Sequence, residues 1–338
     1  MDNITHTLTA VALSQAGFNR KARFATLTLI LAANLPDVDW ISWAWGSATY
    51  LKYHRGITHS ILGVTVLAAL LGWSMYALGR RARPKPGPPL NRGWLLAAAW
   101  AGTSSHLLLD FTNSYGVRPF MPFSSRWYAW DIMFIFDPLL LGLLIVGLGL
   151  PAVLRLVSEE VGAKKPRPRW GAVFCLCALV ALWGLRDFAH RRVVSLLESH
   201  TFAQQNPERV GAFPLPANPF QWTGVVETES AIDVVPANAL AGDVDPEAAQ
   251  VFHKPDPSPA LEAAQATRTG RIFMDFARFP WANNEETDEG YLVTIRDLRF
   301  YSAFAASRGF VVEVNLDKNL RVLSETFSFT APARGGFK

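Results

Sequence analysis

The chain has 338 residues, half of which are hydrophobic, and its mean hydropathy is positive. This composition is uncommon in soluble proteins, so a membrane protein is the first class to test. The formal net charge is +4, yet residues 200–338 carry 12 basic and 18 acidic side chains, against 20 and 10 in residues 1–199. The acidic second part argues against nucleic acid as a partner, because nucleic-acid binding requires a basic surface.

Apolar runs in the first half of the chain predict helices. Three of them, beginning at residues 60, 137 and 170, are long enough to approach the thickness of a bilayer. The others are shorter or, in one case, carry His106, and they are expected to pack among the long helices. In chain order the expected helices are 4–17, 24–35, 60–79, 93–109, 137–154 and 170–185.

Lys and Arg gather in three of the connecting loops. Residues 19–23, 80–92 and 155–169 carry thirteen basic side chains, whereas 38–59 and 111–131 carry four. Because basic loops stay in the cytoplasm, this asymmetry predicts a multi-pass protein of the cytoplasmic (inner) membrane. Five tryptophans then fall at the outer boundary, where aromatic rings favour the interface: Trp40, Trp43, Trp45, Trp127 and Trp130.

The second part of the chain has the pattern of β-strands. The stretch 236–259, rich in Pro, Ala and Asp, is expected to be a long loop, and 315–322 a hairpin turn. We therefore expect a helical membrane domain over residues 1–190, followed by a small β-rich (α+β) extracytoplasmic domain over residues 191–338. Apolar and polar residues alternate, with many Val, Ile, Phe and Thr, over 222–235, 291–301 and 309–329.

Histidines and aspartates gather at the predicted outer face. Asp37 and Asp39 follow Pro36, which ends a helix, and His106 and Asp110 share a helix face because they are four residues apart. Each feature alone is also typical of a hydrogen-bonded interface residue or a turn. Their joint placement favours a metal site, since imidazole and carboxylate groups suit zinc and similar divalent ions. The candidate ligands are His6, Asp37, Asp39, His54, His59, His106 and Asp110.

The segment 54–60, HRGITHS, holds two of these histidines. On a continuous α-helix they would point about 140° apart, so both cannot face one ion from it. We expect the chain to bend at Gly56, with Thr58 available to cap the following helix. Arg55 is a candidate for holding an anionic phosphate; the alternative is an interface arginine that reaches the lipid headgroups.

Motifs in the first half resemble those of the YdjM-like family of membrane-bound, metal-dependent hydrolases, namely His6, NLPDVDW, HRGITHS and HLLLDFTNSYGVRPFMPFS. The resemblance covers about residues 1–155. This family is distantly similar to the helical zinc-dependent phospholipase C and nuclease fold, in which His and Asp bind a zinc cluster that attacks phosphodiesters. No later His-x-x-x-Glu pair follows HLLLD, so one or two Zn²⁺ ions are expected rather than three. The ligands that the resemblance implies are Asp37 or Asp39, His54 or His59, the pair His106 and Asp110, and His6.

These features predict a metal-dependent hydrolase that acts at the outer leaflet on a phospholipid or lipid-linked phosphoester. Its candidate catalytic residues are Asp39, His59 and Arg55, with one of Asp37 and Asp39 binding metal and the other orienting the attacking water. The alternatives are a transporter that uses the same polar cluster, and a scaffold whose β-domain binds a partner through residues 271–291. The lipid bilayer is the expected partner. Polar groups expected to orient the ligands are Ser60, Asn113, Ser114 and Tyr115.

Overall fold

The computed structural model describes the chain except for residues 84–85, 161–168, 302–308 and 330–338. The chain divides into two compact units. A short segment of the first half, Ile41–His54, belongs by its contacts to the second unit. The first unit comprises Met1–Trp40, Arg55–Phe188 and Pro216–Pro219, and the second comprises Ile41–His54, Ala189–Leu215 and Phe220–Lys338.

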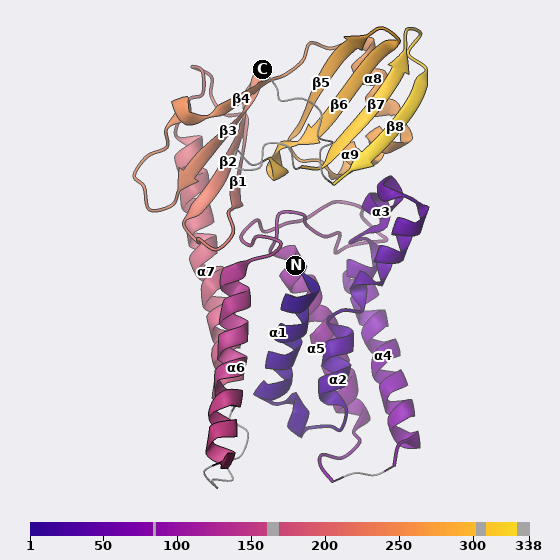
Figure 1. Ribbon diagram of the computed structural model, residues 1–338, viewed down its shortest axis with the longest axis vertical. Coiled ribbons are helices and arrows are strands. Elements are labelled where there is room, and N and C mark those ends of the chain that lie inside the picture. Colours follow the sequence, from indigo (N-terminus) through magenta and orange to yellow (C-terminus); the bar gives the residue numbers. More distant parts are fainter. Residues whose placement is uncertain (84–85, 161–168, 302–308, 330–338) are drawn as a thin grey trace. The chain divides into compact units, whose positions relative to one another are not determined.

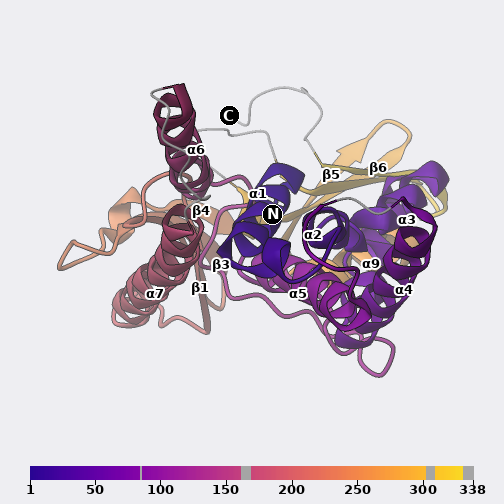
Figure 2. The same cartoon turned by 90° about the horizontal axis from the view of Figure 1, so that it is seen from below.

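The first unit is a helical bundle. Figures 1 and 2 show α1, α2, α4 and α5 packed side by side, and α6 beside α7. The sequence predicted a helix at each of these places, and the helical character of the N-terminal region is confirmed. The largest difference is in α7, which continues thirteen residues past the predicted end at residue 185. The helices are α1 (Asn3–Ala16), α2 (Ala25–Ala32), α4 (Ile61–Arg81), α5 (Arg92–Phe111), α6 (Pro138–Glu160) and α7 (Trp170–Glu198).

Small residues let the helices of the bundle approach closely. A Cβ atom added to Gly102 of α5 would lie 2.5 Å from the Cβ of Ala32 in α2. One added to Gly72 of α4 would lie 2.9 Å from the Cα of Leu96 in α5. Close backbone approach through small residues is the usual way in which helices pack in lipid.

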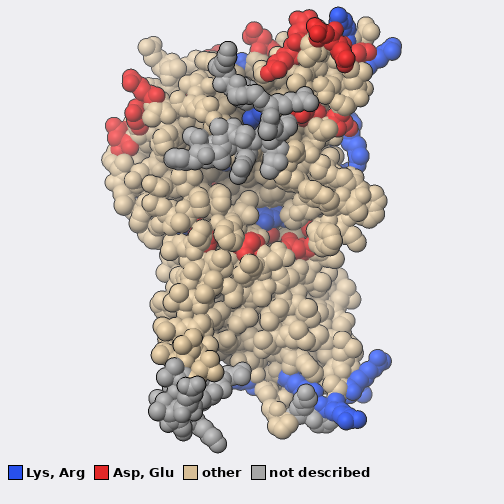
Figure 3. Space-filling model, viewed as in Figure 1, with Lys and Arg blue, Asp and Glu red and all other residues tan. Residues whose placement is uncertain are grey.

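The outward surface of the bundle is apolar. Among the described helices, α4 and α7 are long and apolar enough to cross a bilayer, and Pro138–Leu154 of α6 is a shorter apolar stretch. Leu70 and Val180 are each 62% exposed, and no described charged residue interrupts the middle of the bundle on the face drawn in Figure 3. Soluble proteins seldom expose so large an apolar surface, so these helices suggest contact with lipid. Their orientation and the total number of spans stay predictions.

Two of the basic loops pack together at one end of the bundle. Arg23 donates a hydrogen bond to the carbonyl oxygen of Arg83 at 2.8 Å, and α4 ends with Arg80 and Arg81. Figure 3 shows the basic side chains gathered at this end. In the third basic loop, residues 161–168 lie outside the described part of the chain. The opposite ends of α4 and α5 carry the histidines and aspartates considered below.

The second unit is an α/β domain with two antiparallel four-stranded sheets, ordered β1-β2-β3-β4 and β5-β6-β7-β8. The last part of α7 packs on the first sheet through Val193 and Leu197. Helices α8 (Pro259–Ala266) and α9 (Arg268–Phe276) pack on the second sheet, and α3 (Ser47–Tyr53) packs on α9 and β8. The strands are β1 (Arg209–Pro214), β2 (Gln221–Glu227), β3 (Ala231–Asn238), β4 (Gln250–His253), β5 (Pro280–Thr287), β6 (Gly290–Asp297), β7 (Val311–Asp317) and β8 (Val322–Ser328).

Sequence patterns found some of these strands and missed others. The hairpin between β7 and β8 is confirmed, and the Asp317 carboxylate accepts hydrogen bonds from the backbone of its turn. The prediction of a long loop over 236–259 was wrong at two places, because β3 continues to Asn238 and β4 pairs with it; residues 239–249 and 254–258 contain no strand. A four-residue strand is too short to show a period, so only its pairing reveals it.

The aromatic-rich stretch 271–291 forms most of α9 together with β5, and its phenylalanines are buried. Phe273 is fully buried, and Phe276 and Phe279 are 2% and 3% exposed. These rings therefore pack the core of the second unit and do not form an exposed binding loop.

A buried ion pair joins α7 to the start of α6. A guanidinium nitrogen of Arg186 lies 2.6 Å from the Asp137 carboxylate, and both side chains are fully buried. The other Asp137 oxygen accepts the backbone N–H groups of Leu139 and Leu140 and so caps α6.

We expect Arg186→Met to lower the thermal unfolding midpoint of the detergent-purified protein, because it leaves Asp137 as a buried charge without its counter-ion. Breaking a buried pair in this way costs about 3–5 kcal/mol. Asp137→Asn combined with Arg186→Met should recover most of the loss, since asparagine still caps α6. The exposed Arg192 on the same helix supplies the control, Arg192→Met. Equal midpoints for the two single variants would contradict a structural role for the pair.

Candidate metal centre

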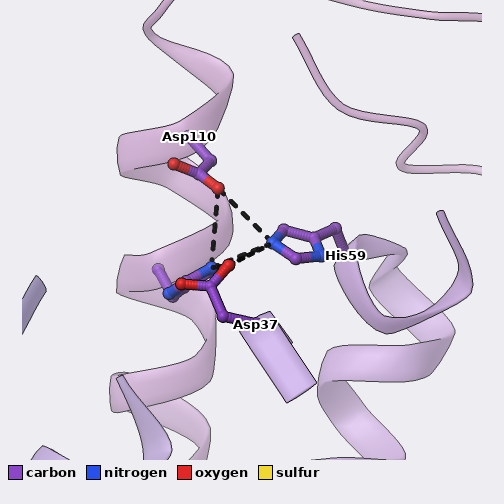
Figure 4. Close-up of side chains that lie close together, drawn as sticks. Asp37, His59 and Asp110 are labelled. Atoms are coloured by element: carbon purple, nitrogen blue, oxygen red, sulfur yellow. Dashed lines mark hydrogen bonds and ion pairs between the residues drawn. The ribbon is translucent and has the colours of Figure 1, made fainter. Parts of the chain in front are cut away.

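Four side chains from three segments converge where α4 begins and α5 ends. Asp37 lies on the 3₁₀ helix Pro36–Trp45, His59 precedes α4, and His106 and Asp110 share one face of α5. Figure 4 shows Asp37, His59 and Asp110 pointing toward one another. The side chain of Asp37 is 18% exposed, whereas the other three are essentially buried. The site is therefore a buried cluster that is least enclosed at Asp37.

The facing atoms are spaced as ligands of one small cation. Nε2 of His59 lies 3.0 Å from Nε2 of His106, and 3.4 Å from both Asp37 Oδ1 and Asp110 Oδ2. Nε2 of His106 lies 3.5 Å from the same two oxygens, and all four ligand atoms lie within 4.8 Å of one another. A regular tetrahedron with edges near 3.4 Å has its centre about 2.1 Å from each corner, close to the distance at which Zn²⁺ binds imidazole and carboxylate. The geometry fits a divalent ion.

The chemistry of the donors also fits a cation. Nδ1 of His106 lies 2.7 Å from the carbonyl oxygen of Ala33, which can only accept, so Nδ1 carries the proton and Nε2 offers a lone pair. This lone pair and two carboxylates surround Nε2 of His59. Buried acceptors that face one another are destabilised unless a positive charge lies among them. A proton or a metal ion can supply that charge.

Without a metal ion, the carboxylates around His59 favour its protonated form. Burial lowers the pKa of His59, but hydrogen bonds to Asp110, Asp37 and Asp39 outweigh it and raise the pKa to about 10. Burial likewise raises the pKa of Asp37, but the hydrogen bond from protonated His59 opposes it and keeps the pKa below its usual range. The carboxylates thus remain charged and stabilise a cation between them.

Asp39 lies behind His59. Its Oδ2 is 3.2 Å from Nδ1 of His59, the nitrogen that points away from the cluster. The same oxygen accepts hydrogen bonds from the backbone N–H of Arg55 and the hydroxyl of Thr58, both at 2.9 Å. Carboxylates in this position orient metal-binding histidines and fix their tautomer. The two aspartates of the DVD motif therefore contact His59 from opposite sides.

The second oxygen of Asp110 is held by positive groups. Oδ1 accepts a hydrogen bond from the guanidinium of Arg55 at 2.9 Å and contacts the N-terminal amino group of Met1. Arg55 is 4% exposed and also donates to Oδ1 of Asn113 at 2.9 Å and to the carbonyl oxygen of Gly116 at 3.3 Å. The structure thus places Arg55 against the cluster carboxylate, in a buried hydrogen-bond network.

The remaining predicted ligands lie outside the four-atom set. His6 is buried, its ring stacks on His106 with centroids 3.9 Å apart, and its Nε2 lies 3.4 Å from Asp110 Oδ1, the oxygen that binds Arg55. His54 ends α3 in the second unit, and its ring stacks on Tyr50 with centroids 4.4 Å apart. His6 thus borders the cluster, and the role of His54 as a ligand stays a prediction.

The turn in HRGITHS differs in detail from the prediction. The residue with left-handed backbone is Arg55, with φ of 54°, and not Gly56. Thr58 does not cap α4, because its hydroxyl donates to Asp39; Ser60 caps the helix by accepting the N–H of Gly63. A non-glycine residue in this conformation is strained, and the hydrogen bonds of the Arg55 N–H and guanidinium stabilise it here.

Some functional groups had no signal in the sequence. The carbonyl of Ala33 orients His106, and a backbone carbonyl leaves no trace in residue type. Of the groups expected to orient the ligands, Ser60 caps a helix and Asn113 holds Arg55. Only the packing of α2 against α5 brings Ala33 to His106.

The fold and site together define a helical, membrane-associated protein with a buried His/Asp cluster that can hold a metal ion, followed by an α/β domain. Residues 1–192 match the model of the YdjM inner membrane protein family, and residues 259–331 match that of the YfhP C-terminal alpha/beta plait domain. The first match covers more than half of the chain, so the protein belongs to the YdjM inner membrane protein family. The resemblance inferred from the motifs is thereby confirmed.

A relative is the uncharacterized protein YfhP of Bacillus subtilis (strain 168), which is 27% identical over 146 residues. The match covers 41% of this chain and 42% of YfhP, less than half the length of that relative. No solved structure matches.

We expect His106→Ala to abolish metal binding, because it removes one of the four donors while leaving the apolar face of α5 intact. Metal content of the detergent-purified variant, measured by mass spectrometry against protein concentration, checks this. Ser105→Ala on the same helix is the matched control, since that hydroxyl donates within the helix, to the carbonyl oxygen of Gly102. Wild-type metal content in the His106 variant would remove this residue from the ligand set.

Asp37→Asn and Asp39→Asn should differ in their effect. Loss of the residue that orients a ligand typically weakens metal affinity about 10–100-fold, so Asp39→Asn should still bind metal at a higher concentration. Asp37→Asn removes a donor of the cluster and should weaken affinity further. Titration of the metal-free proteins with Zn²⁺ in competition with a chelator measures both constants; a larger loss for Asp39→Asn would reverse the two roles.

Proposed function

We propose that this protein is a membrane-embedded, metal-dependent hydrolase that cleaves phosphoester bonds in a phospholipid or lipid-linked substrate. The observation that carries the proposal is the set of four donor atoms separated by 3.0–3.5 Å along five of their six edges. A divalent ion held there would lower the pKa of a coordinated water toward neutrality and stabilise the charge that develops on an ester oxygen.

The residues around the donors support this chemistry by fixing their positions. Asp39 accepts from Nδ1 of His59, and the carbonyl of Ala33 accepts from Nδ1 of His106, so both imidazoles direct Nε2 into the cluster. Because both nitrogens of His59 are engaged, a ligand role suits it better than proton transfer. Arg55 balances one charge of Asp110 and holds its carboxylate in place.

The accessible edge of the cluster is at Asp37, which is 18% exposed. Water or a substrate phosphate would approach there, next to Asp39, which is 8% exposed, and Trp40, which is 67% exposed. A large exposed aromatic ring beside a polar site suits the interfacial region of a bilayer. This supports a substrate whose reactive bond lies at headgroup depth.

The position of the site along the helices supports the outer leaflet. The donors lie at the start of α4 and the end of α5, whereas the basic loops lie at the other ends of these helices. Basic loops remain in the cytoplasm, so the site would face outward. Placement at helix ends also favours hydrolysis over the alternative of transport, which would need polar groups at mid-bilayer.

We expect the purified protein to hydrolyse a phosphodiester such as bis(p-nitrophenyl) phosphate, or phosphatidylglycerol in mixed micelles. Activity should be lost with a chelator, return with Zn²⁺, be absent in His106→Ala and be retained in Ser105→Ala. A panel that adds phosphatidic acid separates diester from monoester specificity. Hydrolysis that persists with the chelator and in His106→Ala would exclude this site as its source. A metal-loaded protein inactive on the whole panel would refute the proposed activity and leave the metal centre in place.

A further inference from the structure

One segment of the chain links two parts of the metal centre. Asp37 and Asp39 precede Ile41–His54, and Arg55 and His59 follow it. By its contacts the chain leaves the first unit after Trp40 and returns to it at Arg55. The segment that connects these site residues is therefore part of the α/β unit.

Contacts within the second unit hold this segment at several points. The hydroxyl of Ser47 donates to the carbonyl oxygen of Phe327 in β8 at 2.7 Å. The guanidinium of Arg268, at the start of α9, donates to the hydroxyl of Thr49 at 3.0 Å. The Trp43 ring stacks on Phe329, with centroids 5.3 Å apart and planes 21° from parallel. Side chains of α3 and of the 3₁₀ helix before it thus contact α9, β8 and the residue that follows β8.

The segment depends on these contacts for its conformation. Helix α3 has seven residues, and isolated helices shorter than about 12–15 residues are marginal in water. Without β8 and α9, the fourteen residues of Ile41–His54 would form a flexible loop. The ends of such a loop, and the site residues next to them, would have to be ordered at the moment when metal binds.

We propose that the α/β unit pre-organises the metal centre through α3, with Ser47, Thr49 and Arg268 acting as positioning residues. By ordering the connecting segment, the unit limits the separation of the two ends of that segment, Trp40 and Arg55, and the N–H of Arg55 binds Asp39. The α/β unit thereby keeps Asp39 at hydrogen-bonding distance from His59. The inference rests on the proposed metal centre and gives the second unit a role in it. Because coupling between two sites is reciprocal, metal binding stabilises the contacts of α3 in return.

The test uses the full-length protein in detergent and Zn²⁺ as the probe. Ser47→Ala combined with Arg268→Ala should weaken Zn²⁺ affinity about fivefold or more, the lower end of the usual coupling between two sites, without changing the amount bound at saturation. Ser47→Thr combined with Arg268→Lys retains the donors and should restore most of the affinity. The control, Arg209→Ala with Ser230→Ala, replaces the same two residue types, which contact Glu227 and Gln205 beside the first sheet, and should bind Zn²⁺ as the wild type does.

Hydrogen exchange of the unmutated protein provides a second measurement that does not depend on any variant folding. Zn²⁺ should slow amide exchange in α3 and β8 and leave β2 and β3 unchanged. Suppose that the wild type binds Zn²⁺, that the double variant binds it equally well, and that exchange in α3 and β8 does not respond to the ion. The coupling is then refuted, whereas the metal centre stands. If the wild type binds no Zn²⁺, both the metal centre and the coupling are refuted.

Discussion

The structure of the site depends on the negative charge of two enclosed carboxylates, Asp37 and Asp110, that point toward each other and toward two histidines. Two carboxylates and two imidazole nitrogens meet at 3.0–3.5 Å inside a bundle whose outer surface is apolar. Burying such groups is costly unless a cation lies among them and their other lone pairs are satisfied. The neighbouring groups meet the second condition: Arg55 and the N-terminus bind Asp110, and Asp39 binds His59. A metal ion suits this cluster because it supplies the cation that the buried donors need.

The helical bundle creates this constraint and also keeps it in place. Gly72 and Gly102 let α4, α5 and α2 approach until their backbones nearly touch, so the end of α5 is held firmly. His106 and Asp110 are consequently fixed donors on one rigid helix face. The donors that depend on loop conformation are Asp37 and His59, and both are next to the segment that the α/β unit holds.

Different segments of the first unit supply the donors. Helix α5 provides His106 and Asp110, the 3₁₀ helix Pro36–Trp45 provides Asp37, and the turn at Arg55 leads to His59. The strained backbone of Arg55 is stable because its N–H and its guanidinium each bind a site carboxylate. One arginine therefore links the turn, the aspartate behind His59 and the aspartate in the cluster.

The sequence alone determined the location of the six bundle helices, the His106/Asp110 pair and the β7–β8 hairpin, because each depends on local periodicity or on turn residues; it missed α3, α8 and α9. It also identified the family through motifs that are local in the chain. Only the tertiary structure decided which aspartate of DVD enters the cluster, that Arg55 binds Asp110, that β4 is a strand, and that Ile41–His54 joins the α/β unit. Each of these features depends on contacts between residues far apart in the chain. The pattern of residues along a helix or strand shows which of its faces is apolar, but it does not show which element packs against that face.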